Sequence, residues 1–249
     1  FTEPPERVEQ AILRYQNQNP AVKLIFLDSF APTDLRLGKA VFPHVHRYQR
    51  KAVFRDRTLF LRSFAGDTNL TEYYSYLYGL PAEPTNWQVP EGLLKRLSLV
   101  PGFLTAPYVM KGLAEGAPDL ENRPIDLHSR IASKGTGWYE AMRRHAEDAA
   151  RSLDHIRLTP PGRIPKKEFL TELRHSKLCW SPFGYGELCW RDLEAFMTGA
   201  VLVKPDMGHL VTMPDLYRPG ETYLPVKWTF LISKRSSVTP YRMTTCGAN

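Results

Sequence analysis

A glycine-rich turn followed by charged residues is the part of this sequence best suited to chemistry. Gly184 and Gly186 form the turn, and Glu187, Arg191 and Glu194 follow it. Glycines let the backbone turn tightly from a strand into a helix, and the unpaired amides at the start of that helix bind diphosphates well. The pattern therefore indicates an anion site at a strand-to-helix junction.

The residues after this turn separate into two faces if they form a helix. Glu187, Arg191 and Glu194 fall on one side, and Cys189 and Leu193 fall on the opposite side. We therefore expect a charged face and a core face over residues 187–198. The alternative is a solvated face with an Arg191–Glu194 ion pair, worth roughly a few tenths of a kcal/mol.

Strands and helices alternate around this turn. Such alternation predicts parallel strands joined by right-handed crossovers, and ligands bind outside the carboxyl ends of such strands. The predicted order is strand 124–128, helix 138–153, strand 155–158, helix 166–174, strand 177–181, helix 187–198 and strand 200–204. The loops 129–137, 182–186 and 205–209 are therefore the expected ligand-binding segments.

The N-terminal part is less regular. It reads as a helix over 8–15, a buried strand over 22–27 and a strand over 58–62 that leads into the turn 66–69. Tyrosines at 73, 74, 76 and 78 indicate a helix packing on a domain face, with a sugar-stacking platform as the alternative. Residues 79–123 are rich in Pro and Gly. We predict an N-terminal domain over 1–120, a C-terminal domain over 121–228 and an atypical tail over 229–249.

Composition narrows the function classes. The 249 residues carry 33 basic and 26 acidic side chains, a net charge of +7 that favours anionic partners. Three cysteines without a CxxC pair support neither a disulfide framework nor a zinc site. No apolar run reaches the roughly 20 residues of a spanning helix. With no signal pattern after Phe1, we expect a processed or truncated chain in the cytoplasm.

Several of these segments together resemble a known family. The glycine turn, Glu187, Arg191 and Glu194, followed by the run 199–203, resemble the donor-binding helix of GT-B glycosyltransferases. Residues 177–228 are similar to exostosin-like glycosyltransferases of bacteria and viruses, and 28–38 and 66–70 resemble N-terminal signatures of that group. The likeness spans roughly residues 20–228 and is weakest over 80–120. It implies an α/β fold of two Rossmann-like domains, both short, with a cleft between them.

The resemblance also implies roles for the acidic residues and glycines. Glu187 would contact the donor sugar as a catalytic residue, and Glu194 would hold the ribose hydroxyls, with Gly184 and Gly186 in the donor site. A carboxylate suits vicinal hydroxyls because it accepts two charge-assisted hydrogen bonds. The two acids are seven positions apart, whereas the retaining motif separates them by eight. The resemblance therefore supports the role of Glu194 better than that of Glu187, and it leaves open whether the mechanism is retaining or inverting.

Basic residues would neutralise the departing nucleoside diphosphate. Arg130 and Lys134 follow the strand 124–128 and resemble the Arg and Lys pair that GT-B enzymes place on the diphosphate, and Arg191 is the third candidate. Lys204 begins a loop that could close over the donor, and the resemblance places Thr222 near the same site. An ordinary surface position is the alternative for each base.

The acceptor side needs a general base if the enzyme inverts. Asp67, in the turn 66–69, is the catalytic candidate, with Asp28 second and an Asx turn or helix cap as the alternative. The implied partners are a nucleotide-sugar donor and a carbohydrate or glycolipid acceptor, with membrane contact only through the acceptor. No metal or other cofactor is required, since the basic residues carry the phosphate charge.

Two other functions stay open. A catalytically silent, truncated relative would act as a carbohydrate-binding protein, which the short length favours. A basic nucleic-acid-binding protein would fit the net charge and the 12% aromatic content, but the Lys and Arg residues are spread along the chain and no recognition motif is present. We therefore expect no nucleic-acid partner.

Overall fold

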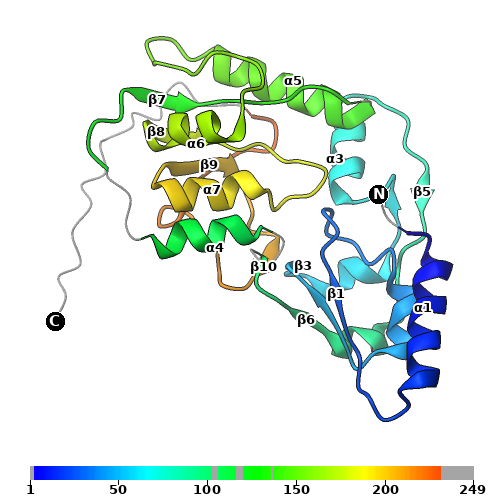
Figure 1. Ribbon diagram of the computed structural model, residues 1–249. Coiled ribbons are helices and arrows are strands. Elements are labelled where there is room, and N and C mark those ends of the chain that lie inside the picture. The colour runs from blue at the N-terminus through cyan, green and yellow to red at the C-terminus, as the bar shows by residue number, and fades with distance from the viewer. Residues whose placement is uncertain (1–2, 103–105, 116–119, 136, 231–249) are drawn as a thin grey trace.

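Two parallel sheets organise the chain (Figure 1). The computed structural model describes residues 3–102, 106–115, 120–135 and 137–230. The first sheet has the order β1-β2-β6 and the second the order β11-β9-β8-β7, with every neighbouring pair parallel. Their bounds are β1 Ile25–Asp28, β2 Arg47–Arg50, β6 Leu97–Leu99, β7 Ile125–His128, β8 Ser176–Trp180, β9 Val201–Pro205 and β11 Tyr223–Val226. The chain is thus a mixed α/β protein with parallel sheets, as predicted.

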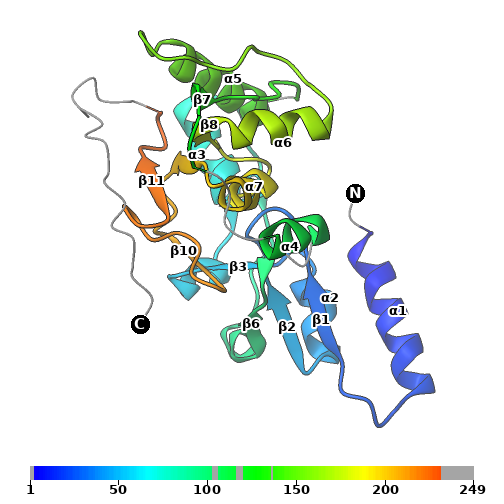
Figure 2. The same cartoon turned by 60° about the vertical axis from the view of Figure 1, so that its left-hand side comes forward.

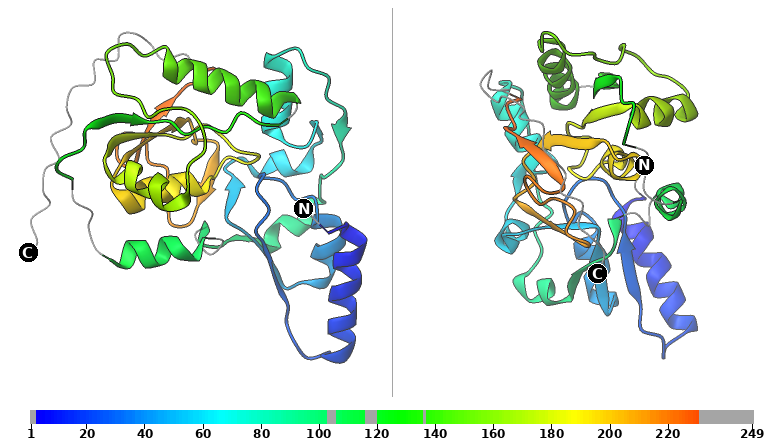
Figure 3. Two further views of the ribbon diagram at one scale, coloured as in Figure 1. Left: turned by 45° about the horizontal axis from the view of Figure 1, so that its top comes forward. Right: turned by 90° about the vertical axis from the view of Figure 1, so that its left-hand side faces the viewer.

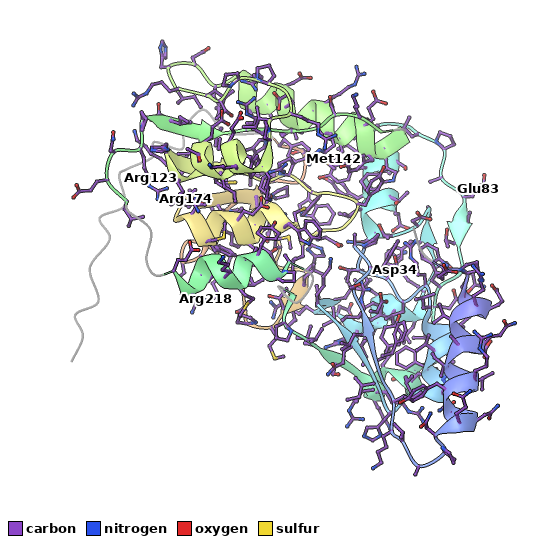
Figure 4. All side chains as sticks on the ribbon, viewed as in Figure 1. Asp34, Glu83, Arg123, Met142, Arg174 and Arg218 are labelled. Atoms are coloured by element: carbon purple, nitrogen blue, oxygen red, sulfur yellow. The ribbon has the colours of Figure 1, made fainter. Side chains whose placement is uncertain are left out.

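Helices cover both faces of the second sheet. α5 (Gly137–Arg151) lies on one face, where Trp180 Nε1 donates to the carbonyl oxygen of Ala146. Cys179, the next residue along β8, is buried on the other face near α7 (Trp190–Thr198), and burial raises the pKa of its thiol to about 12. α6 (Lys166–Arg174) packs beside α7. Figure 4 labels Met142 on the inner side of α5, where its side chain is fully buried.

The first sheet has a smaller set of helices. α1 runs along its outer edge in Figure 3 and contacts α2. No residue of α1 is buried, so the apolar side of this helix is only partly covered by the rest of the chain. The remaining elements of this half are α1 Pro5–Gln18, α2 Gly38–Val41, η1 Phe42–His44, β3 Ala52–Phe54, η2 Arg57–Leu61, β4 Phe64–Ala65, α3 Asn69–Leu77, β5 Pro84–Thr85 and η3 Glu91–Arg96.

The two halves are joined by strand pairing and by helix contacts. β10 (Leu210–Thr212) pairs antiparallel with β3, although more than 150 residues separate them. Arg55 reinforces this junction by donating to the carbonyl oxygens of Gly208 and Leu210. α4 (Pro107–Ala114) packs on α7 of the second half, as Figure 2 shows. The predicted boundary near residue 120 stays a prediction, and from residue 231 the predicted tail lies outside the described residues.

The structure corrects two predicted strands. Residues 57–61 form the 3-10 helix η2 instead of a strand, because Asp56 caps it by accepting from the backbone N–H of Thr58. Residues 155–158 form only one bridge, between Leu158 and Leu127, and a Pro160–Pro161 pair that follows cannot continue a ladder. β8 therefore lies between β7 and β9 in the sheet.

The tyrosines of α3 pack in an aromatic cluster rather than forming an open platform. Tyr74 is fully buried and stacks with Tyr78, Trp138 and Trp228. Its hydroxyl donates to the carbonyl oxygen of Trp228, which ties α3 to the end of the second sheet. Tyr76, in contrast, points into solvent. The packing interpretation of this stretch is therefore confirmed for Tyr74.

Candidate functional site

A cavity of about 1190 Å³ opens between the two halves. It lies where β1, β2 and β6 end, with Asp28, Lys51 and Val100 in its wall, and where the loop after β8 enters α7. The carboxyl ends of strands from both parallel sheets thus face one space, which is where ligands bind in open α/β sheets. The full lining is Leu27, Asp28, Ser29, Ala31, Lys51, Val100, Pro101, Tyr139, Arg143, Arg163, Ile164, Lys166, Phe169, Gly184, Tyr185, Gly186, Leu188, Cys189, Trp190, Arg191 and Glu194.

Cations outnumber carboxylates in this wall. Lys51, Arg143, Arg163, Lys166 and Arg191 line the cavity, against Asp28 and Glu194. Such a surplus of positive charge in a concave site raises the local concentration of anionic ligands.

Two of the arginines are neighbours, and neither forms an ion pair with an acidic side chain in the described part of the chain. Arg143 is buried and donates to the carbonyl oxygens of Ala132 and Phe183. Arg191 donates to the carbonyl oxygen of Arg130, and its buried Nε has no acceptor among the described residues. Burial and the charge of Arg191 lower the pKa of Arg143. A guanidinium stays protonated at neutral pH, so the pair presents two positive charges to the cavity.

The two glycines of the turn are in the wall, but for different reasons. A Cβ on Gly186 would lie 1.9 Å from the carbonyl oxygen of Ala31, whereas one on Gly184 would meet Cys189 Sγ at 3.3 Å. Gly186 is therefore required by close contact between the loop after β8 and the loop after β1. The helix begins at Trp190 instead of Glu187, so Gly184 and Gly186 precede it by several residues.

Both carboxylates of the wall are already engaged. Asp28 is buried, forms an ion pair with Arg50 at 2.8 Å and accepts from Tyr48 Oη at 2.5 Å. Glu194 is buried too, and accepts from Tyr108 Oη at 2.5 Å and from Lys166 Nζ. The alternative of a solvated face with an Arg191–Glu194 ion pair is therefore wrong, because α4 and α6 supply Glu194 with partners that the sequence pattern could not show.

Glu187 lies beside the cavity instead of in its wall. Its side chain is fully buried, with Oε2 accepting from Thr33 Oγ1 at 2.8 Å and Oε1 lying 3.6 Å from His209 Nε2. Thr33 belongs to the loop after β1 and His209 to the loop after β9. Despite the burial, contact with His209 and Thr33 leaves the pKa of Glu187 lowered. The carboxylate therefore links the two halves.

The remaining predicted site residues lie elsewhere. Arg130 is neutralised by Glu172 at 2.5 Å, and this hydrogen bond raises its pKa. Lys204 is fully buried against Asp192, and Thr222 bonds the carbonyl oxygen of Leu216 beside a smaller apolar pocket. Lys134 and Asp67 are exposed and outside the cavity wall. Of the predicted donor-binding and catalytic residues, the wall therefore includes Gly184, Gly186, Arg191 and Glu194.

Sequence reasoning missed Lys51 and Arg143. Lys51 follows β2, a segment with no clear period, and Arg143 sits in a helix that carries several other bases. The one available signal was the position of Arg143 next to Met142 and one turn before Ala146, which puts an arginine close to a buried stripe.

Aromatic rings form one rim of the cavity. Tyr139 and Tyr185 stack with ring centroids 4.1 Å apart and planes 10° apart. Tyr185 stays 57% exposed, so its outer face is open to a ligand. Planar rings and sugar faces bind well on such surfaces.

His128, at the end of β7, is a buried histidine without a hydrogen bond. Neither ring nitrogen forms a hydrogen bond with a described residue. The nearest carboxylate oxygen is that of Glu172, 3.6 Å from Nε2. Burial, and to a lesser extent the positive charge of Arg191, lowers the pKa of His128 to about 4. The ring packs edge-on against Phe169 of the cavity wall at 4.7 Å.

This histidine predicts how stability depends on pH. The unfolded chain takes up a proton near pH 6.5 and the folded chain only near 4, so the stability contributed by neutral His128 is complete above about 6.5 and lost as the pH falls. We expect the free energy of unfolding to drop by about 3 kcal/mol more in the wild type than in His128→Phe between these pH values. Urea unfolding across this range measures it. An unchanged slope in His128→Phe would contradict the assignment, and His46→Phe, an exposed position, is the control.

The described residues contain no group of three or more His, Cys, Asp or Glu side chains placed to hold a metal ion. No helix among them is long and apolar enough to cross a membrane.

No protein-family model matches this chain, and a search of curated proteins finds no match. Its function must therefore be argued from the cavity.

Proposed function

We propose that this chain is a GT-B-like glycosyltransferase that moves a sugar from a nucleotide-sugar donor to a carbohydrate or glycolipid acceptor. The observation that carries the proposal is the pair Arg143 and Arg191, without an acidic partner, in a cavity at the carboxyl ends of strands from both sheets. Guanidinium groups bind phosphate oxygens in a planar, bidentate manner. The proposed architecture is two Rossmann-like domains with the donor cleft between them.

Each part of a donor has a suitable surface in this cavity. Arg143 and Arg191 would hold the diphosphate, and the charge that develops on this leaving group is what catalysis must stabilise. The outer face of Tyr185 would stack on the base or sugar. Glu194 would accept from donor hydroxyls after exchanging Tyr108 or Lys166 for the ligand. The proposed reaction needs no metal, because the arginines carry the phosphate charge.

One observation favours a second candidate, a catalytically silent relative that binds the donor without transferring it. Asp28 and Glu194, the carboxylates of the wall, are both paired, and Asp67 lies outside it. An inverting reaction needs an available base at the acceptor hydroxyl. Transfer or slow hydrolysis of a bound nucleotide-sugar supports the enzyme. Tight binding with neither reaction supports the silent relative.

A thermal-shift screen against UDP, GDP, CDP, ADP, TDP and their sugars is the first test. A ligand at about 100 times its dissociation constant stabilises the fold by about 2.7 kcal/mol. Stabilisation by one diphosphate and its sugar supports the proposal. If none of them raises the melting temperature, the proposal is wrong.

Substitution of the arginines gives a sharper prediction. Arg191→Ala and Arg143→Ala should each weaken binding of the stabilising nucleotide by roughly 10- to 100-fold, since a hydrogen bond to a charged group is worth about 1.5–3 kcal/mol. Isothermal titration calorimetry measures the affinity. Arg144→Ala is the matched control, because Arg144 is the next residue on α5, is exposed and pairs with Glu140. Equal affinities in Arg143→Ala and Arg144→Ala would exclude Arg143 from the site.

A further inference from the structure

Lys51 is the buried cation that the proposed donor site leaves unexplained. It follows β2 in the N-terminal half, its side chain is only 6% exposed, and it lines the cavity. No ion pair or hydrogen bond joins its ammonium group to any described residue. A buried charge without a partner is unfavourable, so such a group either loses its proton or awaits an anion.

The charged groups around Lys51 are committed to other partners. Asp28 pairs with Arg50, and Glu187 binds Thr33 and faces His209. Arg50 itself donates to the carbonyl oxygen of Pro32. Burial and the charge of Arg50 lower the pKa of Lys51, while Cys189, Glu187 and Asp28 oppose this shift. The local protein therefore supplies Lys51 with no dedicated counter-ion.

Lys51 and the arginine pair line the same cavity, Lys51 from the N-terminal half and the arginines from α5 and α7. Cys189 is near both Lys51 and Arg143, since a charge on its sulfur acts on the pKa of each. A Cβ on Gly102 would lie 3.2 Å from Leu188 and 3.6 Å from Lys51 Cβ, so the two halves touch beside this lysine. An anion in the cavity would thus meet a cation from each half.

We propose that Lys51 is an anion-binding residue of the N-terminal half that holds the same diphosphate group as Arg143 and Arg191, so that the ligand bridges the two halves. This inference rests on the proposed function for the identity of the ligand, but the same cations would bind any diphosphate. Two sources share that chemistry, a nucleoside diphosphate and inorganic pyrophosphate. A bound anion favours the protonated form of Lys51 and so opposes the lowering of its pKa by burial, which couples binding to proton uptake at high pH.

Proton uptake gives a test that a merely structural lysine would not pass. The affinity of the full chain for UDP and for pyrophosphate is measured by calorimetry at about pH 7.5 and at about pH 9.5. Because burial lowers the pKa of Lys51, the higher pH favours the neutral amine more than it would for an exposed lysine. All variants carry Cys189→Ser, because the sulfur of Cys189 also faces Lys51. Tyr139, also in the wall, has its pKa raised by burial and stays neutral there.

The inference predicts three distinct profiles. The parent should bind more weakly at the higher pH, and Lys51→Arg should bind equally at both. Lys51→Met should bind about 10- to 100-fold more weakly than the parent at the lower pH. Lys177→Met, an exposed lysine paired with Asp126, is the control and should match the parent. Melting temperatures show whether each variant is folded.

The outcomes separate this inference from the proposed function. Equal affinity of Lys51→Met and the parent for UDP overturns the inference and leaves the proposed function standing. Lys51-dependent binding of pyrophosphate without binding of UDP or the other nucleoside diphosphates supports the inference and overturns the proposed function. Failure of the parent to bind either probe overturns both. A pH dependence that persists in Lys51→Arg also overturns the inference.

Discussion

Gly186→Ala should destabilise the folded chain by about 3 kcal/mol or more, whereas Gly184→Ala should cost less than about 1 kcal/mol. A Cβ at 186 would lie 1.9 Å from the carbonyl oxygen of Ala31 and 2.3 Å from its carbonyl carbon. These are backbone atoms, so no rotamer change relieves the overlap. At 184 the nearest atom is Cys189 Sγ at 3.3 Å, and a small displacement of this side chain suffices.

The loop that Gly186 contacts is firmly held. Arg50 donates to the carbonyl oxygen of Pro32, and Thr33 donates to Glu187 on the far side of the contact. Alanine at 186 must therefore move the loop after β1 away from the loop after β8, which opens the cavity and breaks the Thr33–Glu187 bond.

Urea unfolding of the matched pair measures both effects as shifts of the midpoint at constant slope. Equal stability of the two alanine variants would show that the halves separate easily at this contact. A Gly184→Ala variant that is stable but binds no nucleotide would instead show that the turn serves the ligand directly, which the sequence pattern by itself suggested.

Lys204→Met should also cost about 3–5 kcal/mol of stability, because it leaves Asp192 buried without its cation. Lys204 and Asp192 are both fully buried, 3.1 Å apart. Asp192 further accepts from Ser181 Oγ and Tyr217 Oη, each at 2.6 Å, so the carboxylate joins the end of β8, the start of α7 and the loop before β11. Burial and Asp192 together raise the pKa of Tyr217 well above its usual value, which keeps that hydroxyl a donor.

The same substitution at an exposed ion pair provides the control. Lys177 lies 2.6 Å from Asp126, but its side chain is 53% exposed, and surface pairs of this kind contribute about 0–1 kcal/mol. Both variants replace a paired lysine by methionine, so the difference between their denaturation midpoints reports the effect of burying the ion pair. A fully stable Lys204→Met that had lost nucleotide binding would contradict a structural role and return Lys204 to the donor site.

Local pattern was sufficient for most elements of the second half. The helix predicted over 166–174 is α6 at the same bounds, and the strands at 124–128, 177–181 and 200–204 are β7, β8 and β9 within one residue at each end. Short apolar runs between turn residues mark buried parallel strands independently of their neighbours. The strand predicted at 155–158 failed because its edge position gives it only one bridge, a property that no local period records.

The candidate site was predictable only where it lies on one segment. Gly184, Gly186, Arg191 and Glu194 are close in sequence, and the structure places all four in the cavity wall. Lys51 and Arg143 come from other elements and reach the same wall only through folding. The partners of Glu194, which are Tyr108 and Lys166, were equally hidden, because they lie on α4 and α6.

The sequence by itself determined most elements of the second half and the strand-to-helix turn, because each depends on residues a few positions apart. The alternation of these elements then predicted a parallel sheet. The tertiary structure alone decided which charges face the cavity and which are neutralised. Glu187 and Lys204 read as ligand-binding residues along the chain, yet both are buried against partners from distant segments. The sequence shows the sign of each charged residue, but whether that residue has a counter-ion depends on contacts between residues far apart in the chain.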